Sequence, residues 1–429
     1  MPKKRIASEP TEDYPDLSGW QATGPSLAVA SSGAFGGLGT LVGAIILAPV
    51  IHALVRLRSV APDAATIAEL VAATLGGRAG TFTATLQTIG YAVLAVVGAQ
   101  TFGLQMAAPV IDEPATVAET WTWPVYSVAA LVLITLLAYA LPGRVVAGLA
   151  AVLAAVGLLI TFYNALAIIA SVLSGTPPVD VGGEPLPTGF ATASALAVLA
   201  VGLVGFDVIT TRAGEVRWLG RPMGIAIGAV TLVALLVWLA DHLGGTGALR
   251  LSPRQFGYIV YSMYPEAGVI SMAVATVCLG FAAVLGLMWA IVRLVQGVDD
   301  RISSEAALAI LLGLMAVLIV ARCRDWVGIH GATNYVGELV LLLMYAVVVE
   351  ASARIPGGQE RSDSGTAAGE STVIWWSRIL VPSALAAVAL LPVVNSRFAV
   401  SAVWPLAIVA VIAAIAAAVS VMGRREAAD

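Results

Sequence analysis

The sequence predicts an all-α integral membrane protein with about twelve transmembrane helices. Of its 429 residues, 59% are hydrophobic and only 11% are charged, and the mean hydropathy is +0.94. A soluble domain carries roughly 25% charged residues, so this apolar surplus indicates a surface that faces lipid. At about 20 residues for each crossing of the bilayer core, with short loops between crossings, the length allows about twelve helices.

Composition also argues against several classes of function. The net charge is −4 at pH 7, which provides no basic footprint for a nucleic-acid partner. Cys278 and Cys323 are too few for a disulfide framework or a thiolate metal site. The three histidines are scattered, and no long soluble segment gathers them with acids, so the chain is not expected to be an enzyme. The polar N-terminus indicates a retained tail, because no apolar stretch and cleavage site follow its basic start.

Apolar stretches with at most one charged residue, between polar breaks, mark the predicted spans. The first stretch, 18–55, is interrupted at Gly24-Pro25 and again at Ser31-Ser32-Gly33. The remaining stretches are 81–111, 121–141, 145–173, 189–211, 222–240, 265–292, 306–321, 331–349, 374–393 and 398–422. Residues 60–80 combine helical spacing with charges, as in a membrane-surface helix or the cytoplasmic start of the next span. Residues 356–373 are rich in Gly, Ser and acids and predict a flexible loop.

The distribution of cations favours two spans within 18–55. With two spans there, 17 of the 22 Lys and Arg residues lie on the side of the N-terminus, and the other side holds only Arg250, Arg254, Arg322, Arg324 and Arg397. A single span would move the three cations of the tail to the other side and weaken this asymmetry. By the positive-inside rule, the first set is cytoplasmic, both termini are cytoplasmic, and the protein is a multi-pass protein of the cell membrane.

Residues 200–227 carry a resemblance to a known family. They read AVGLVGFDVITTRAGEVRWLGRPMGIAI, with Gly205-Phe206-Asp207 followed by Glu215-Val216-Arg217. This stretch resembles the sixth-helix signature of the amino acid–polyamine–organocation (APC) superfamily of transporters. The sequence departs from the signature at Gly214, where the family usually has a second acid, and at Trp218-Leu219, where it usually has Asn-Pro.

The resemblance implies a LeuT-like fold, in which two inverted repeats of five helices form the core and two helices follow. It assigns 1–17 to a cytoplasmic tail, 18–173 to the first repeat, 174–355 to the second, 356–373 to a cytoplasmic loop, 374–422 to two accessory helices and 423–429 to a second tail. Family members generally use a longer first helix pair than 18–57 can supply, so an abbreviated first half-site is expected. The implied activity is secondary transport of amino acids or related amines by alternating access.

Substrate sites in such folds lie near the bilayer midplane, where two spans are broken and free helix ends face a cavity. Small residues at the two breaks are therefore the candidate substrate-binding positions, because backbone amides there can hold a carboxylate without a cationic side chain. The candidates are Ser31, Ser32, Gly33, Gly202, Gly205, Phe206 and Asp207. The same small residues could instead serve close helix packing.

Asp207 is the main candidate for coupling. A carboxylate at this depth is costly without a partner or a proton, so it could bind a substrate ammonium or carry a proton, or it could cap the helix that follows the break. Glu338 is a second candidate for gating or proton relay, or a partner of Arg322 or Arg324, and Glu215 is a candidate for cytoplasmic gating.

Sodium coupling is less favoured than proton coupling or exchange. Ser271 and Thr276 are the only hydroxyl residues of 268–292, and their spacing does not place them together. No metal site or other cofactor is expected. Gln87 and Tyr91 lie on one helix face and could line a pathway or only bond between helices. A transport-inactive scaffold or sensor of the same fold remains the alternative function, and the sequence does not define an oligomeric state.

The charge asymmetry gives a testable topology. A single cysteine introduced by Ser8→Cys into a Cys278→Ala/Cys323→Ala background should resist a membrane-impermeant maleimide in intact cells and react after the cells are opened. Labelling of this cysteine in intact cells would place the tail outside and contradict the two-span interpretation of 18–55.

Overall fold

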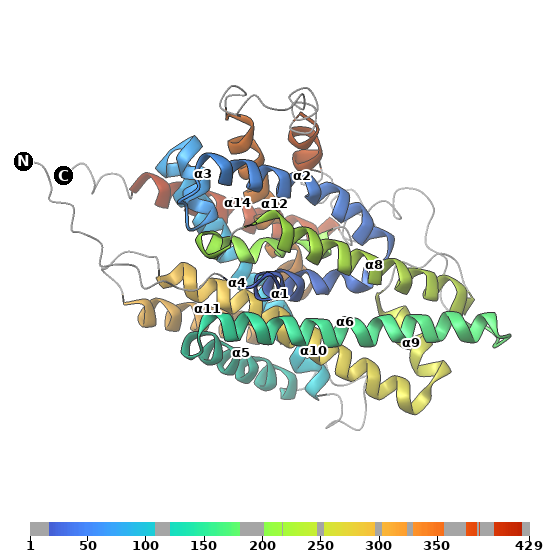
Figure 1. The fold of residues 1–429 in the computed structure, drawn as a ribbon. Helices are drawn as coiled ribbons and strands as arrows, with labels where there is room; N and C mark the ends of the chain where they lie inside the picture. The colour runs from blue at the N-terminus through green and yellow to red at the C-terminus, as the bar shows by residue number, and fades with distance from the viewer. Residues whose placement is uncertain are drawn as a thin grey trace, which may run out of the picture.

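The protein is a bundle of long helices (Figure 1). The computed structural model describes residues 17–107, 121–180, 201–216, 218–246, 253–296, 303–323, 329–355, 375–383, 386 and 399–422. Among these residues, eight helices are long and apolar enough to cross a membrane: α2, α4, α5, α6, α8, α10, α11 and α12, whose bounds are given below. Each coincides with one of the predicted spans.

The first stretch forms a short helix, a turn of 3-10 helix and then a long helix. Helix α1 (Gly19–Ala30) begins at a capping box, in which the Ser18 hydroxyl accepts from the Gln21 amide and the Gln21 side chain accepts from the Ser18 amide. The 3-10 helix η1 (Ser31–Phe35) follows, and α2 (Leu38–Val60) comes next. The predicted break at Ser31-Ser32-Gly33 therefore lies where the α-helix ends. The interruption predicted at Gly24-Pro25 is wrong, because both residues lie inside α1.

The rest of the first half follows the predicted spans closely. A short helix, α3 (Ile67–Leu75), is capped by the Thr66 hydroxyl and precedes α4 (Gly77–Ala107), so 60–80 supplies both a separate helix and the start of the next span. Helices α5 (Thr122–Ala140) and α6 (Gly143–Leu173) complete this half. Leu141 and Pro142 separate them, since Leu141 precedes a proline and adopts an extended conformation that ends α5.

The sixth predicted span is interrupted. Its described part consists of the 3-10 helices η4 (Val201–Leu203) and η5 (Phe206–Glu215), and the earlier part of 189–211 lies outside the described residues. Helix α8 (Gly220–Gly244) follows. Two short strands, β1 (Val179–Asp180) and β2 (Gly245–Thr246), pair in parallel with Val179 opposite Gly245.

The second half continues with α9 (Pro253–Met263), α10 (Pro265–Gln296), α11 (Ser304–Cys323), α12 (Ile329–Ala353) and α14 (Ala399–Met422). Residues 375–383 are helical and belong to the eleventh predicted span. The predicted tails 1–17 and 423–429 and the loop 356–373 lie outside the described residues, apart from Leu17.

Helix α1 lies at the centre of the bundle, between α6 and α8 and against α10 (Figure 1). Around it, α4 packs against α5, α10 and α12, and α14 covers α4 and α12. The Arg56 guanidinium on α2 donates to the Ile355 carbonyl at 3.2 Å, which ties α2 to the chain just after α12. The central position of α1 places the end of its α-helix inside protein rather than against lipid.

Gly24 allows α1 to approach α6 closely. A Cβ atom at this position would overlap the Ala147 carbonyl oxygen and lie 2.6 Å from Ala151 Cβ. Gly148, on α6, instead faces open space, with no atom within 4 Å of a Cβ added there. The first glycine is required by packing, whereas the second is not.

This contrast gives a prediction with a matched control. Gly24→Ala should destabilise the protein by about 1–3 kcal/mol, because the added methyl group meets backbone that cannot move aside. Gly148→Ala should leave stability unchanged or raise it by roughly 0.5–1 kcal/mol through helix propensity. The thermal unfolding midpoint of each purified variant in the same detergent measures both effects, and equal midpoints for the two variants would contradict the close contact.

Candidate functional site

The two interrupted segments meet in the middle of the bundle. The 3-10 helix η1, which follows α1, contacts η4 of the sixth segment, and α1 itself contacts η5. Both breaks are enclosed by α8 and α10, which contact η1 and η5. Backbone groups freed from regular helical bonding are tolerated at this depth only when protein or a ligand meets them, so this meeting point is the candidate site.

Asp207 occupies this point with its carboxylate fully buried. The Tyr91 hydroxyl on α4 donates to Asp207 Oδ2 at 2.8 Å, and the Tyr345 hydroxyl on α12 donates to Asp207 Oδ1 at 2.5 Å. Two helices that are far apart in sequence therefore each provide one phenol for one carboxylate. Charge-assisted hydrogen bonds of this kind are about twice as strong as neutral ones, which offsets part of the cost of burying the acid.

Each phenol is itself held by a donor. The Gln87 amide donates to the Tyr91 hydroxyl at 3.0 Å and to Thr210 Oγ1 at 3.3 Å, and the Gly205 amide donates to the Tyr345 hydroxyl at 3.0 Å. The two hydroxyl protons are thereby directed at Asp207. The result is a continuous network from α4 through the sixth segment to α12.

Gly205 supplies the turn that starts η5. Its φ of +94° lies in the left-handed region, which glycine adopts without strain. A Cβ atom here would also lie 2.7 Å from Val29 Cγ1 on α1. The residue that precedes η5, Gly205, has no side chain to cap it, so the N–H group at Phe206 is the kind of backbone donor that holds an anion at a helix start.

Contacts at the two ends of the segment formed by α1 and η1 close the site. On one side, the Phe35 ring of η1 lies against the Phe256 ring of α9, with centroids 6.2 Å apart. On the other side, the Leu17 amide donates to the Glu215 carbonyl at 3.2 Å, and the Gln21 side chain donates to the Arg144 carbonyl at 3.4 Å. The structure thus holds the start of α1 against η5 and α6.

Glu215 belongs to the contacts at the start of α1 and not to the Asp207 site. It accepts from Arg212 Nη1 at 3.1 Å, and the Arg212 guanidinium lies 4.8 Å from the centroid of the Trp289 ring on α10. The Trp289 indole in turn donates to the Gly143 carbonyl at the start of α6. Glu215 comes eight residues after Asp207 in the sequence and lies beyond a kink at Arg212, where the backbone of η5 is not helical.

Glu338 is also not in contact with Asp207, but it shares a face with one of its partners. It lies seven residues before Tyr345 on α12, which is two helical turns or about 10 Å. Its side chain is partly buried, and among the described residues no hydrogen bond or ion pair reaches it. The pairing with Arg322, considered as the alternative to gating, is therefore absent within the described part of the chain, and Arg324 lies outside it.

The structure brings together Gly205, Phe206 and Asp207 and places Ser31 and Gly202 in the neighbouring 3-10 helices. The Ser31 hydroxyl donates to the Ala28 carbonyl at 2.6 Å, so it caps α1. Ser32 and Gly33 belong to η1 as well. The two hydroxyl groups considered for sodium are engaged elsewhere, Ser271 with Asn164 and Thr276 with the Met272 carbonyl. No cluster of three His, Cys, Asp or Glu residues occurs in the described part of the chain.

Sequence reasoning missed Tyr345 and Thr210. A signal for Tyr345 was present, because its hydroxyl interrupts the apolar run LVLLLMYAVVV on the helix face that also carries Glu338. Gln87 and Tyr91 were recognised as sharing a face, and the structure directs that face at Asp207.

Comparisons with known proteins reveal similarity of structure without similarity of sequence. No protein-family model matches the chain, and no curated protein sequence matches it significantly. Among solved structures, MhsT in complex with L-phenylalanine is similar with a TM-score of 0.60 and 13% identity, covering 87% of this chain and 99% of that one. A manganese transporter from Eremococcus coleocola is similar with a TM-score of 0.59 and 13% identity, covering 95% of both chains.

The chain has a LeuT-like fold. At 13% identity this likeness concerns the fold alone, and it covers nearly the whole length of both kinds of structure. The predicted all-α membrane protein with a LeuT-like fold is thereby confirmed.

The Tyr345 hydroxyl gives a prediction about stability. Tyr345→Phe should lower the free energy of unfolding by about 1–3 kcal/mol, because it leaves the Gly205 amide and one Asp207 oxygen buried without that partner. Tyr139→Phe is the control: Tyr139 also donates to a carboxylate, Glu305, at 2.7 Å, but at an exposed position, so roughly 0.5 kcal/mol or less is expected. Thermal unfolding of both variants compares the losses, and equal losses would contradict the role assigned to the buried phenol.

Proposed function

We propose that this protein is a secondary active transporter of the APC superfamily, which moves amino acids or related amines across the cell membrane by alternating access. Both termini are proposed to be cytoplasmic, as the charge distribution favours. Transport is coupled to protons or proceeds by exchange. The observation that carries the proposal is a buried carboxylate, Asp207, at the point where two interrupted spans meet.

This position offers recognition for the carboxylate of an amino acid. The first turn of η5 provides a backbone N–H at Phe206 suited to that carboxylate. This role needs no lysine, and Lys3 and Lys4 are the only lysines of the chain. Phe206 and Tyr345, whose ring centroids are 5.6 Å apart, add an apolar surface beside this group.

Coupling is assigned to Asp207 as well. Burial in an apolar environment disfavours the charged form of a carboxyl group, whereas the hydrogen bonds from Tyr91 and Tyr345 favour it. Because burial and the two hydrogen bonds act in opposite directions, the carboxyl group can gain a proton when one phenol moves away and lose it when the phenol returns. Alternating access supplies such a movement, because the phenols stand on helices other than the sixth segment.

The neighbours in structure suggest which compounds to test first. The solved structures are of a protein in complex with L-phenylalanine and of a manganese transporter. A thermal-shift screen of the purified protein should therefore cover the amino acids, polyamines and Mn²⁺. An amino acid or amine that raises the midpoint, and is then taken up by proteoliposomes as a radiolabelled compound, would support the proposal. Stabilisation by a compound that is neither accumulated nor exchanged would favour the alternative, a transport-inactive sensor or scaffold.

Asp207→Asn tests the coupling assignment. The variant keeps the shape of the side chain but does not titrate, so it should retain counterflow exchange of the identified substrate and lose uphill accumulation driven by an imposed pH gradient. Proteoliposome uptake with and without the gradient measures both. Glu350→Gln serves as the control, because Glu350 is an exposed acid of α12 that pairs with Arg354 and Arg378.

Other outcomes distinguish the remaining assignments. Gradient-driven accumulation that survives in Asp207→Asn would exclude Asp207 as the proton carrier and direct attention to Glu338, for which Glu338→Gln is the corresponding variant. Loss of substrate binding in Asp207→Asn would instead show that the carboxylate contacts the substrate ammonium. Gly205→Val is a poor probe of the site, because its strained backbone and overlap with Val29 would also affect folding.

A further inference from the structure

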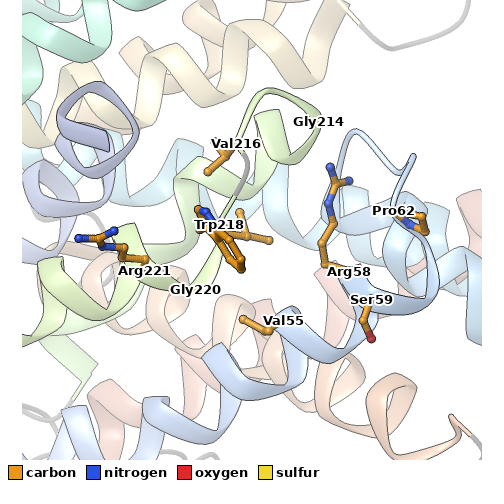
Figure 2. Close-up of a pocket in the computed structure, with 10 residues that line it drawn as sticks. Val55, Arg58, Ser59, Pro62, Gly214, Val216, Trp218, Gly220 and Arg221 are labelled. Atoms are coloured by element: carbon orange, nitrogen blue, oxygen red, sulfur yellow. The ribbon is translucent and has the colours of Figure 1, made fainter. Parts of the chain in front are cut away.

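A cavity of about 690 Å³ lies between the end of α2 and the start of α8, away from Asp207 (Figure 2). Two arginines line it, Arg58 from α2 and Arg221 from α8, and none of the ten described lining residues is acidic. In Figure 2 the Trp218 side chain lies between these two arginines, and it is 66% exposed. The charge of this lining suits an anionic ligand.

The arginines keep donors for such a ligand. Arg58 Nη1 donates to the Ala64 carbonyl, which fixes the side chain and uses one of the five N–H groups of a guanidinium. Arg221 stands in the first turn of α8, a turn that no side chain caps. Arginine pairs with phosphate through two parallel hydrogen bonds, and an exposed tryptophan is typical of the headgroup level of a membrane.

An apolar groove of about 880 Å³ continues from this cavity. It runs between α1, α6 and α8, and the two hollows share Val216, Trp218 and Arg221. Beyond the shared residues, apolar side chains dominate the groove, among them Leu27, Leu158, Phe162, Ile225, Leu232 and Val233. The hollows together form a site with a basic end and an apolar end.

The length of the groove fits a chain within one leaflet. Arg221 and Val233 are twelve residues apart on α8, which corresponds to about 18 Å. Half of a hydrocarbon core of about 30 Å is roughly 15 Å. An acyl chain that starts at the basic end would therefore reach the midplane of the bilayer within the groove.

We propose that these two hollows bind one anionic phospholipid, with its headgroup in the cavity that Arg58 and Arg221 line and an acyl chain in the groove between α1, α6 and α8. A free phosphate compound would satisfy the basic end but not the apolar end. A zwitterionic phospholipid would leave the excess positive charge uncompensated. Basic pockets between transmembrane helices on the side assigned here to the cytoplasm are the places where anionic headgroups bind.

Native mass spectrometry of the full-length protein tests this proposal through binding, so its outcome does not depend on transport. The purified protein is given equimolar phosphatidylglycerol and phosphatidylcholine, and one retained phosphatidylglycerol is expected. Each arginine near an anionic lipid is worth about a fivefold change in affinity, so Arg58→Gln/Arg221→Gln should lower the preference for phosphatidylglycerol about 25-fold. Arg78→Gln/Arg293→Gln removes the same charge at two exposed positions outside both hollows and should leave the preference unchanged.

A second pair of variants tests the apolar end of the site. Ala229→Phe places a ring in the groove and should reduce retention of phosphatidylglycerol at least tenfold, whereas Gly228→Phe places a ring in open space and should not. If the preference for phosphatidylglycerol falls equally in the two double arginine variants, the proposal is overturned. Equal retention in the two phenylalanine variants, or displacement of the lipid by millimolar glycerol 3-phosphate, would show a site for a soluble phosphate and would also overturn it.

Discussion

A carboxylate that is buried among transmembrane helices must find its hydrogen-bond donors inside the protein, and this requirement organises the centre of the structure. Asp207 obtains its donors from Tyr91 and Tyr345, which are 116 and 138 residues away in the sequence. The tyrosines are oriented by Gln87 and by the backbone of Gly205. A single side chain therefore links α4, α12 and the sixth segment through one hydrogen-bond network.

The two acids of η5 show how depth changes the role of a charge. Asp207 lies at the start of this segment and is held by neutral phenols, whereas Glu215 lies at its end and is held by a cation, Arg212. The Arg212–Glu215 pair is partly exposed and is separated by only three residues, so its contribution to stability is small. The pair instead helps to position η5 against α10, because Arg212 also contacts Trp289 on α10.

Much of the fold could be predicted from the sequence, because the thickness of a bilayer fixes how long an uncharged stretch must be. The stretch 145–173, for example, lies two residues from the observed start of α6 and shares its end. The glycines at the sixth break were also informative, since Gly205 does adopt a left-handed conformation. Gly24-Pro25 misled the prediction because helix packing and helix interruption both select small residues, and only the approach of α6 distinguishes the two.

The site itself was less predictable. Asp207 stood out as a lone acid within a span, but a tyrosine such as Tyr345 is common in apolar helices, and nothing local to it indicates a partner 138 residues away. The same holds for the polar face of Gln87 and Tyr91, which suited a pathway and a packing contact equally well. Contacts between distant helices depend on the rotation of each helix about its axis, and a nearly all-apolar helix provides little pattern from which to derive that rotation.

The contact at Gly24 has a geometric consequence for α1. Helices that meet through side chains interlock ridges with grooves, and this interlocking fixes the angle at which they cross. At Gly24 the backbone of α1 rests directly on the backbone of α6, so the two helices cross as closely as a contact between small residues allows. Packing against α8 and α10, and the hydrogen bonds of Gln21 and Leu17 at the start of α1, act together with this crossing to fix the tilt of α1. The tilt in turn sets the position of the residues that follow Ala30.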